Sequence, residues 1–307
     1  MLLTSEHQPH HARLKGVGFI MFSVLVWAGW MLLSSYGVRG TLTVYDLTAL
    51  RFGTAGLVLL PLLLKRGLRL GPWGIWGGPA LAMTMGASYN TIAIMGMKYA
   101  PTAHLSMIMT AMLSLTTLGG IFLLRERTTK LRLTGIAISI AGVVCLLSSA
   151  DSTHSAAELA MGHALFIFAG SIWAGYALMM KAWKLDALHA TAAVCVYSAV
   201  LYLPIYFLFL PSHITAENWQ QAVFQAGYQG VVNSVFALLC FNRAIALLGA
   251  ATTSAFLPLI PVIATLGAIP LLGDVPSGLD WLGITLATAG VLLSSGMVRL
   301  RTRVAGW

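Results

Sequence analysis

Long apolar runs, separated by short polar segments, fill almost the whole sequence. Each run has about 20 residues, which is enough for a helix to cross a hydrocarbon core of about 30 Å. The pattern predicts an all-α integral membrane protein with ten transmembrane helices. The expected spans are residues 17–37, 44–64, 74–97, 102–124, 132–149, 161–181, 188–210, 221–247, 251–272 and 279–298.

Composition supports lipid as the surrounding solvent. The 307 residues are 58% hydrophobic and only 9% charged, whereas a soluble domain carries about 25% charged residues. A net charge of +9 would suggest nucleic acid as the partner of a soluble protein. Here the basic residues sit in short segments beside the apolar runs, so membrane orientation and anionic lipid explain them better. We therefore expect the lipid bilayer, and no nucleic acid, as a partner.

The basic residues also predict how the chain is oriented. If the amino terminus is cytoplasmic, 15 of the 18 Lys and Arg residues fall in cytoplasmic segments. The three exceptions are Arg39, Arg51 and Lys98. Cytoplasmic loops carry an excess of Lys and Arg in membrane proteins. The distribution thus predicts that both termini are cytoplasmic.

The two halves of the chain repeat each other. Trp27-Ala28-Gly29-Trp30 in the first run has a near-copy, Trp173-Ala174-Gly175-Tyr176, in the sixth, and Ala141-Gly142-Val143 recurs as Ala289-Gly290-Val291. We expect one repeat in residues 1–150 and a second in 151–307. Because five spans is an odd number, the second five-helix repeat must cross the membrane inverted. Inverted repeats are typical of secondary transporters, whose substrate site lies between them near the midplane.

Several short motifs, each weak alone, occur in an order that resembles the drug/metabolite transporter superfamily, of the ten-span EamA type. They are the early Trp-Ala-Gly-Trp, Arg51-Phe52, Lys98-Tyr99-Ala100-Pro101-Thr102-Ala103, Arg125-Glu126, Arg243-Ala244-Ile245-Ala246 and the Pro258/Pro261 pair. The resemblance implies a bacterial cytoplasmic (inner) membrane protein in which spans 1, 3, 4, 6, 8 and 9 surround a central cavity. Spans 2 and 7 would be peripheral, and spans 5 and 10 would pack the halves together. Within the superfamily the chain is most similar to the YddG-type aromatic amino acid exporters.

Aromatic and small polar residues deep in the spans are the candidates for substrate binding. Trp27 and Trp173 lie too far inside their spans to be interfacial belt residues, so a cavity role is the preferred interpretation. The amides and hydroxyls equally fit interhelical hydrogen bonds. The predicted substrate-binding set is Trp27, Trp30, Tyr89, Asn90, Thr110, Trp173, Tyr176, Asn233 and Ser254.

Charges near the spans are predicted to serve structure or gating. Lys98 and Arg243 end spans three and eight, where gating contacts or interface anchoring both fit. Pro258 and Pro261 predict a kink or hinge in span nine, because proline removes backbone hydrogen bonds. Arg51 is expected to pair with Asp46 or to snorkel rather than to bind a ligand.

His104, His163 and His189 lie near span starts. Each could titrate near neutral pH, although a lone histidine is more often merely tolerated. No carboxylate occupies the centre of a predicted span and no basic cluster lies at mid-depth, so the chamber is expected to be uncharged. Backbone groups freed by the span-nine prolines could help to hold a polar substrate.

These features favour a secondary transporter that exports small neutral metabolites by alternating access. An uncharged, ring-walled chamber suits aromatic and other neutral amino acids, moved by uniport or with weak proton coupling. The alternative is a drug or other metabolite antiporter of the same superfamily, for example of purines or sugar derivatives; net import stays open. An enzyme is not expected, since no catalytic constellation occurs at depth. No cofactor, metal or obligatory protein partner is predicted.

Overall fold

The protein is all-helical throughout the part described by the computed structural model, which comprises residues 10–126, 128–149 and 154–294. Eight helical stretches in this part are long and apolar enough to cross a membrane. Two of the ten expected spans do not meet this criterion of length and hydropathy. The third predicted span is split into shorter helices, and the tenth contains only 17 helical residues before residue 295. The end of that last span, like residues 150–153, lies outside the described residues.

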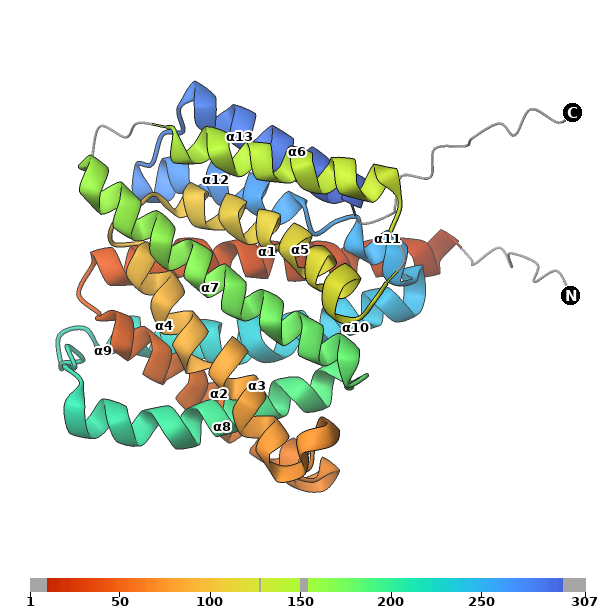
Figure 1. Cartoon of the computed structure of the whole chain (residues 1–307). Coiled ribbons are helices and arrows are strands. Elements are labelled where there is room, and N and C mark those ends of the chain that lie inside the picture. The colour runs from red at the N-terminus through yellow and green to blue at the C-terminus, as the bar shows by residue number, and fades with distance from the viewer. Residues whose placement is uncertain (1–9, 127, 150–153, 295–307) are drawn as a thin grey trace, which may run out of the picture.

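The helices follow one another along the chain as labelled in Figure 1. They are α1 (His10–Arg39), α2 (Val44–Arg66), η1 (Gly71–Trp76), α3 (Gly77–Met85), α4 (Ala87–Gly96), α5 (Thr102–Leu123), α6 (Lys130–Leu147), α7 (Ala156–Ala182), α8 (Ala187–Phe209), α9 (Trp219–Gln225), the π-helix η2 (Ala226–Phe236), α10 (Ala237–Leu248), α11 (Ala250–Ser254), α12 (Leu259–Leu272) and α13 (Gly278–Ser294).

The third predicted span is broken at Gly86, which joins α3 to α4. Gly86 has a non-helical ψ of −138°, and the hydroxyl of Ser198 on α8 accepts the backbone N–H of Ala87 at 3.2 Å. A Cβ at Gly86 would lie 1.9 Å from that hydroxyl oxygen. The break therefore depends on a contact with a distant helix, which the apolar pattern of the segment did not reveal.

The eighth and ninth segments are also irregular at mid-depth. The eighth widens into η2 between α9 and α10, and such π-helical turns are frequent at functional sites. The ninth stops at Ser254 and resumes at Leu259, directly after Pro258, which has no N–H to continue the ladder. The interruption predicted from the proline pair is thus present.

Glycines allow a close helix contact between α6 and α13, which lie side by side in Figure 1. A Cβ at Gly142 would be 2.7 Å from the backbone nitrogen of Ala287, and one at Gly290 would be 2.4 Å from the backbone nitrogen of Ser139. Small residues let lipid-embedded helices gain dispersion energy by close approach. The expectation that spans 5 and 10 pack together agrees with this geometry.

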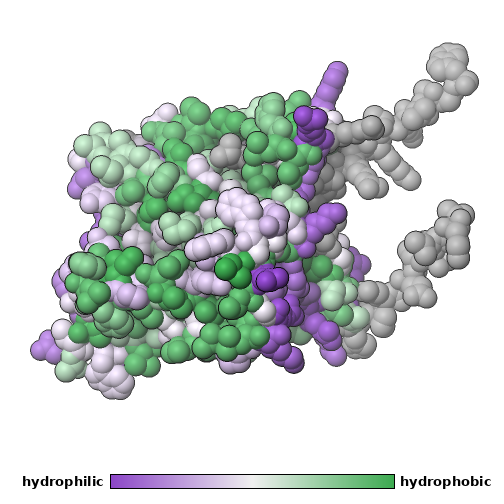
Figure 2. Space-filling model, turned by 60° about the horizontal axis from the view of Figure 1, so that its bottom comes forward, coloured by the Kyte–Doolittle hydropathy of each residue, from purple (hydrophilic) through white to green (hydrophobic). Residues whose placement is uncertain are grey.

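The surface matches a protein that sits in lipid. Figure 2 shows a face covered mostly by hydrophobic residues, with hydrophilic residues gathered along one edge. Large apolar side chains such as Phe207, Phe209 and Phe122 are more than three-quarters exposed. That degree of apolar exposure is unfavourable in water and ordinary in a bilayer.

We expect Gly290→Ala to destabilise the protein, because the added methyl group would meet backbone atoms of α6 that cannot move away. The overpacking should cost about 1–3 kcal/mol, measured as a lower Tm in detergent. The matched control is Gly18→Ala in α1, where a Cβ would have nothing within 4 Å and helix propensity favours alanine. Equal stability of the two variants would contradict this account of the α6–α13 contact.

Candidate functional site

A cavity of about 420 Å³ lies inside the bundle, which is within the size range of small-molecule sites. Seven of the nine predicted substrate-binding residues line it. They are Trp27, Trp30, Tyr89, Thr110, Trp173, Tyr176 and Asn233. The two tryptophans of the repeated motif therefore face the interior rather than lipid.

Aromatic rings form much of the cavity wall, and they contact one another in pairs. Trp30 of α1 stacks on Tyr89 of α4 with ring centroids 6.2 Å apart. Trp27 packs against Phe241 of α10 at 5.2 Å. Trp30 and Tyr89 are almost fully buried, so the structure holds these rings in place before any ligand arrives.

Arg51 also lines the cavity, which corrects the expectation of an uncharged chamber. Its Nη1 donates a 2.7 Å hydrogen bond to Asn90 Oδ1. Its guanidinium lies 5.3 Å from the ring centroids of both Trp30 and Phe52, a distance at which cation–π attraction is significant. The Arg51 side chain is thereby fixed against the aromatic wall.

The predicted pairing of Arg51 with Asp46 is wrong. Asp46 caps its own helix: Thr43 Oγ1 accepts the Asp46 N–H, and Asp46 Oδ2 accepts the Thr43 N–H at 2.8 Å. The same carboxylate accepts the hydroxyl of Tyr206 at 2.6 Å and the N–H of His213 at 3.1 Å. Through these hydrogen bonds, Asp46 connects the start of α2 to α8 and to the segment that follows α8.

Arg51 consequently has no carboxylate partner among the described residues, whose ion pairs involve other groups. Three cavity-lining residues also keep a buried polar atom without a hydrogen-bond partner in the described structure: Arg51 Nε, Trp30 Nε1 and Asn233 Oδ1. Unsatisfied buried groups of this kind are costly. Each of these residues of the cavity lining thus has one polar atom that no described group satisfies.

Asn90 and Ser254 do not line the cavity, contrary to expectation. Asn90 lies fully buried behind Arg51, where its Nδ2 donates to Thr48 Oγ1 at 2.9 Å. Its amide therefore supports the arginine from α4. Ser254 ends α11 and is partly exposed, while Leu257 and Ile260, which follow it, reach the cavity.

The four predicted gating residues lie around the site rather than in it. Lys98 follows α4 and Arg243 lies in α10; both are exposed. Pro258 and Pro261 are buried. The carbonyls of Ser254 and Leu257, which these prolines leave without a normal helical donor, accept the N–H groups of Leu257 and Ile260. The expectation that freed carbonyls hold a substrate therefore loses its support.

Several cavity residues were not expected from the sequence. Besides Arg51 and Phe52 of α2, they include Thr191, Val194 and Cys195 of α8. The second and seventh spans are therefore not purely peripheral, as the resemblance implied. One available signal was Arg51 itself, because an ionisable residue deep in a span marks a functional site by default.

No set of three His, Cys, Asp or Glu side chains in the described ranges is arranged to hold a metal ion. What the site can do chemically is bind a partly apolar molecule of metabolite size between aromatic rings and a fixed guanidinium.

Comparison with known proteins agrees with a membrane transporter. The model of the EamA-like transporter family matches the chain twice, over residues 14–148 and 160–296. The uncharacterized transporter YyaM of Bacillus subtilis is 27% identical over 82% of this chain and 84% of its own. The uncharacterized inner membrane transporter YedA of Escherichia coli K12 is 24% identical over 80% of each.

A similar fold has also been solved. One crystal structure gives a TM-score of 0.58 at 23% identity and covers 94% of this chain and 97% of the other, which supports the fold alone. With the family match spanning both halves and a ring-walled cavity between apolar helices, the chain is a multi-pass membrane transporter that belongs to the EamA-like transporter family.

Proposed function

We propose that this protein exports aromatic and other neutral amino acids across the cytoplasmic membrane by alternating access, as a YddG-type transporter. The observation that carries the proposal is the cavity in which Arg51, without a carboxylate partner in the described structure, lies against an aromatic wall. A zwitterion with an apolar side chain complements each part of that surface.

The carboxylate of such a substrate would pair with Arg51. A buried cation in a lipid-embedded bundle is unfavourable until an anion compensates it, and guanidinium groups bind carboxylates through two parallel hydrogen bonds. Of the five N–H donors of Arg51, one on Nη1 is engaged by Asn90 Oδ1, and Arg51 Nε and Trp30 Nε1 are without a partner in the described structure. The substrate therefore supplies the negative charge that the described residues do not.

The ammonium group and the side chain of the substrate would contact other residues of the cavity. Asn233 Oδ1 is an acceptor for the ammonium group, and the rings of Trp27, Trp173 and Tyr176 suit an apolar or aromatic side chain. Met31, Met85 and Met109 also line the cavity. Methionine adapts to differently shaped partners, which fits a transporter of several neutral amino acids.

Helix contacts support two repeats related by a pseudo-two-fold axis in the membrane plane. If α1 corresponds to α7 and α5 to α12, then the contact of α1 with α12 is matched by that of α7 with α5. Likewise α1 with α10 matches α7 with α4, and α2 with η2 matches α8 with α3. The corresponding helices α2 and α8 meet, as do α6 and α13.

Five crossings per repeat would make the halves inverted, with both termini cytoplasmic by the distribution of Lys and Arg. The interruptions at Gly86 and between Ser254 and Leu259 then lie in helices that could bend as the cavity changes its exposure. Either uniport or weak proton coupling is compatible with this arrangement.

Reconstituted protein should show saturable flux of labelled phenylalanine that unlabelled aromatic amino acids compete with. Absence of such flux for both phenylalanine and threonine would contradict the proposed substrate class. Saturating uptake of a purine or sugar derivative alone would favour the antiporter alternative instead.

Arg51→Gln should weaken phenylalanine transport strongly, because the substrate carboxylate loses a charge-assisted partner. A charged hydrogen bond contributes about 1.5–3 kcal/mol, so KM should rise about 10- to 100-fold at 1.4 kcal/mol per tenfold. The control is Arg66→Gln, an exposed arginine paired with Asp186. The effect should also shrink for the competitor phenylalanine amide, which lacks the carboxylate; equal losses for both compounds would argue against carboxylate recognition.

Trp27→Ala and Trp173→Ala should each reduce selectivity for aromatic over small neutral amino acids. Removing one ring from the wall loses about 0.5–1.5 kcal/mol of aromatic pairing with the substrate beyond the buried area. The preference for phenylalanine over threonine should therefore become smaller. Competition assays across amino acids measure the change. Trp281→Ala, which changes a side chain exposed on α13, is the control, and a similar shift in that variant would rule out a specific wall contact.

A further inference from the structure

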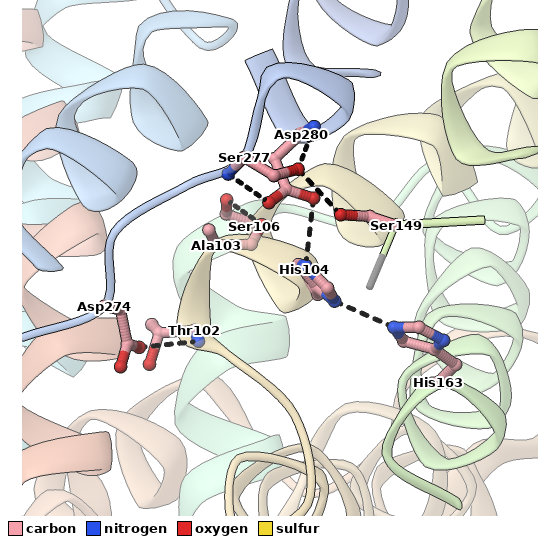
Figure 3. Close-up of polar contacts among 9 residues, drawn as sticks. All are labelled: Thr102, Ala103, His104, Ser106, Ser149, His163, Asp274, Ser277 and Asp280. Carbon is pink, nitrogen blue, oxygen red and sulfur yellow. Dashed lines mark hydrogen bonds and ion pairs between the residues drawn. The ribbon is translucent and has the colours of Figure 1, made fainter. Parts of the chain in front are cut away.

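A buried chain of three titratable side chains joins three helices away from the cavity. His104 Nδ1 lies 2.8 Å from His163 Nε2, and His104 Nε2 lies 3.2 Å from Asp280 Oδ1. Their exposed fractions are 2%, 5% and 6%. Figure 3 shows His104 of α5 between the other two, with His163 on α7 and Asp280 on α13. We call these three residues the triad.

The triad lies nearer to one end of the bundle than the cavity does. His104 is in the first turn of α5, before the cavity-lining residues Ser106 and Met109. His163 likewise precedes Trp173 on α7. By the proposed orientation this is the outer end. The helices that carry the cavity wall are thus pinned together between the cavity and the outer solution.

Polar groups around the triad hold Asp280 in place. Its Oδ2 accepts the N–H of Ser277 at 2.8 Å, and its own N–H donates to Ser277 Oγ. Ser277 Oγ in turn lies 2.8 Å from Ser149 Oγ, after α6. These contacts, also visible in Figure 3, connect a fourth helix to the same point.

The other described charges at this end bond other groups or are exposed. Arg39 of α1 pairs with Asp274, whose Oδ2 also accepts the N–H of Thr102. Glu158, at the start of α7, caps that helix through Ser155, with His154 beside it. Lys98 after α4 is exposed. Within the described residues, α6 and α12 present no charged side chain to the triad.

The hydrogen bonds limit how many protons the closed triad can hold. With Asp280 ionised and both imidazoles neutral, His104 donates from Nε2 to Asp280 and accepts at Nδ1 from His163. One added proton keeps both bonds and brings the net charge of the triad to zero. A second proton on the imidazoles would place an N–H of His104 against an N–H of His163 across the 2.8 Å contact and break that hydrogen bond. The closed form therefore fits one proton.

We propose that His104, His163 and Asp280 form a proton-binding site that locks the outer end of the transporter: the proton-loaded, neutral triad favours the closed end, and its loss favours opening. Without the proton the buried triad carries a net negative charge, which is costly in low dielectric and is relieved when water enters. Acidic outer solution would then return the carrier toward the form that loads from the cytoplasm.

This inference rests on the proposed alternating access, but its test measures the shape of the protein and needs no substrate. Cys145, Cys195 and Cys240 are replaced by alanine, and spin labels are placed at Ala157→Cys on α7 and Leu279→Cys on α13, two exposed sites at the triad end. Distances are measured by double electron–electron resonance in phosphatidylcholine nanodiscs at pH 5.5 and pH 8.

The population with the longer distance should grow severalfold from pH 5.5 to pH 8. His104→Gln and Asp280→Asn should each remove this pH dependence; either alone suffices if the other does not fold. His154→Gln, beside the α7 label, and His189→Gln, which in the native protein bonds the Gly67 carbonyl at the other end, should keep it.

A pH-independent distance in the protein with an intact triad would overturn the proposal, as would growth of the longer distance on acidification. So would an unchanged pH response in both triad variants, which would make the triad a purely structural link. Absence of phenylalanine flux, in contrast, would overturn the proposed substrate and leave this measurement valid.

Discussion

The need to stabilise a guanidinium inside a lipid-embedded bundle determines how the site is built. Hydrocarbon offers no hydrogen bonds, so a cation at that depth must be satisfied by the protein or by a ligand. The protein stabilises the guanidinium in part, through a hydrogen bond to the Asn90 amide and cation–π contacts with Trp30 and Phe52. These contacts position α1, α2 and α4 relative to one another, and they leave Arg51 without a carboxylate partner in the described structure.

Close helix packing explains why an open cavity can persist in such a bundle. The glycine contacts of α6 with α13, and the contact of Gly56 on α2 with Ala199 on α8, bring helix backbones together at the edges of the molecule. Small residues do this without a hydrophobic driving force, through dispersion and shape. In the middle, tryptophan and tyrosine side chains keep the helices apart and line the resulting space.

Two helices connect the cavity to the triad. The α5 helix carries His104 and the cavity residues Met109 and Thr110, and α7 carries His163 and Trp173. A continuous helix transmits a displacement of its end to residues two or three turns away. A change of charge at the triad is therefore placed to alter the exposure of the cavity, and reciprocally a substrate that moves these helices would alter the affinity of the triad for a proton.

The amino-acid pattern was sufficient for the features that depend on local composition. It determined the helical class, most of the spans and the interruption before Leu259, because hydrocarbon length and proline chemistry act within one segment. The repeated Trp-Ala-Gly motif also identified aromatic residues that prove to line the cavity.

Only the tertiary structure decided which partner each polar side chain has. Asp46 bonds Tyr206 and not Arg51, Asn90 supports Arg51 from behind, and His104 meets Asp280 from the far end of the chain. The split at Gly86 likewise depends on Ser198. Each pairing is set by the rotation of one helix against another. A single sequence does not carry that information, because an unsatisfied polar group in lipid is satisfied equally well by any neighbour that the fold brings within reach.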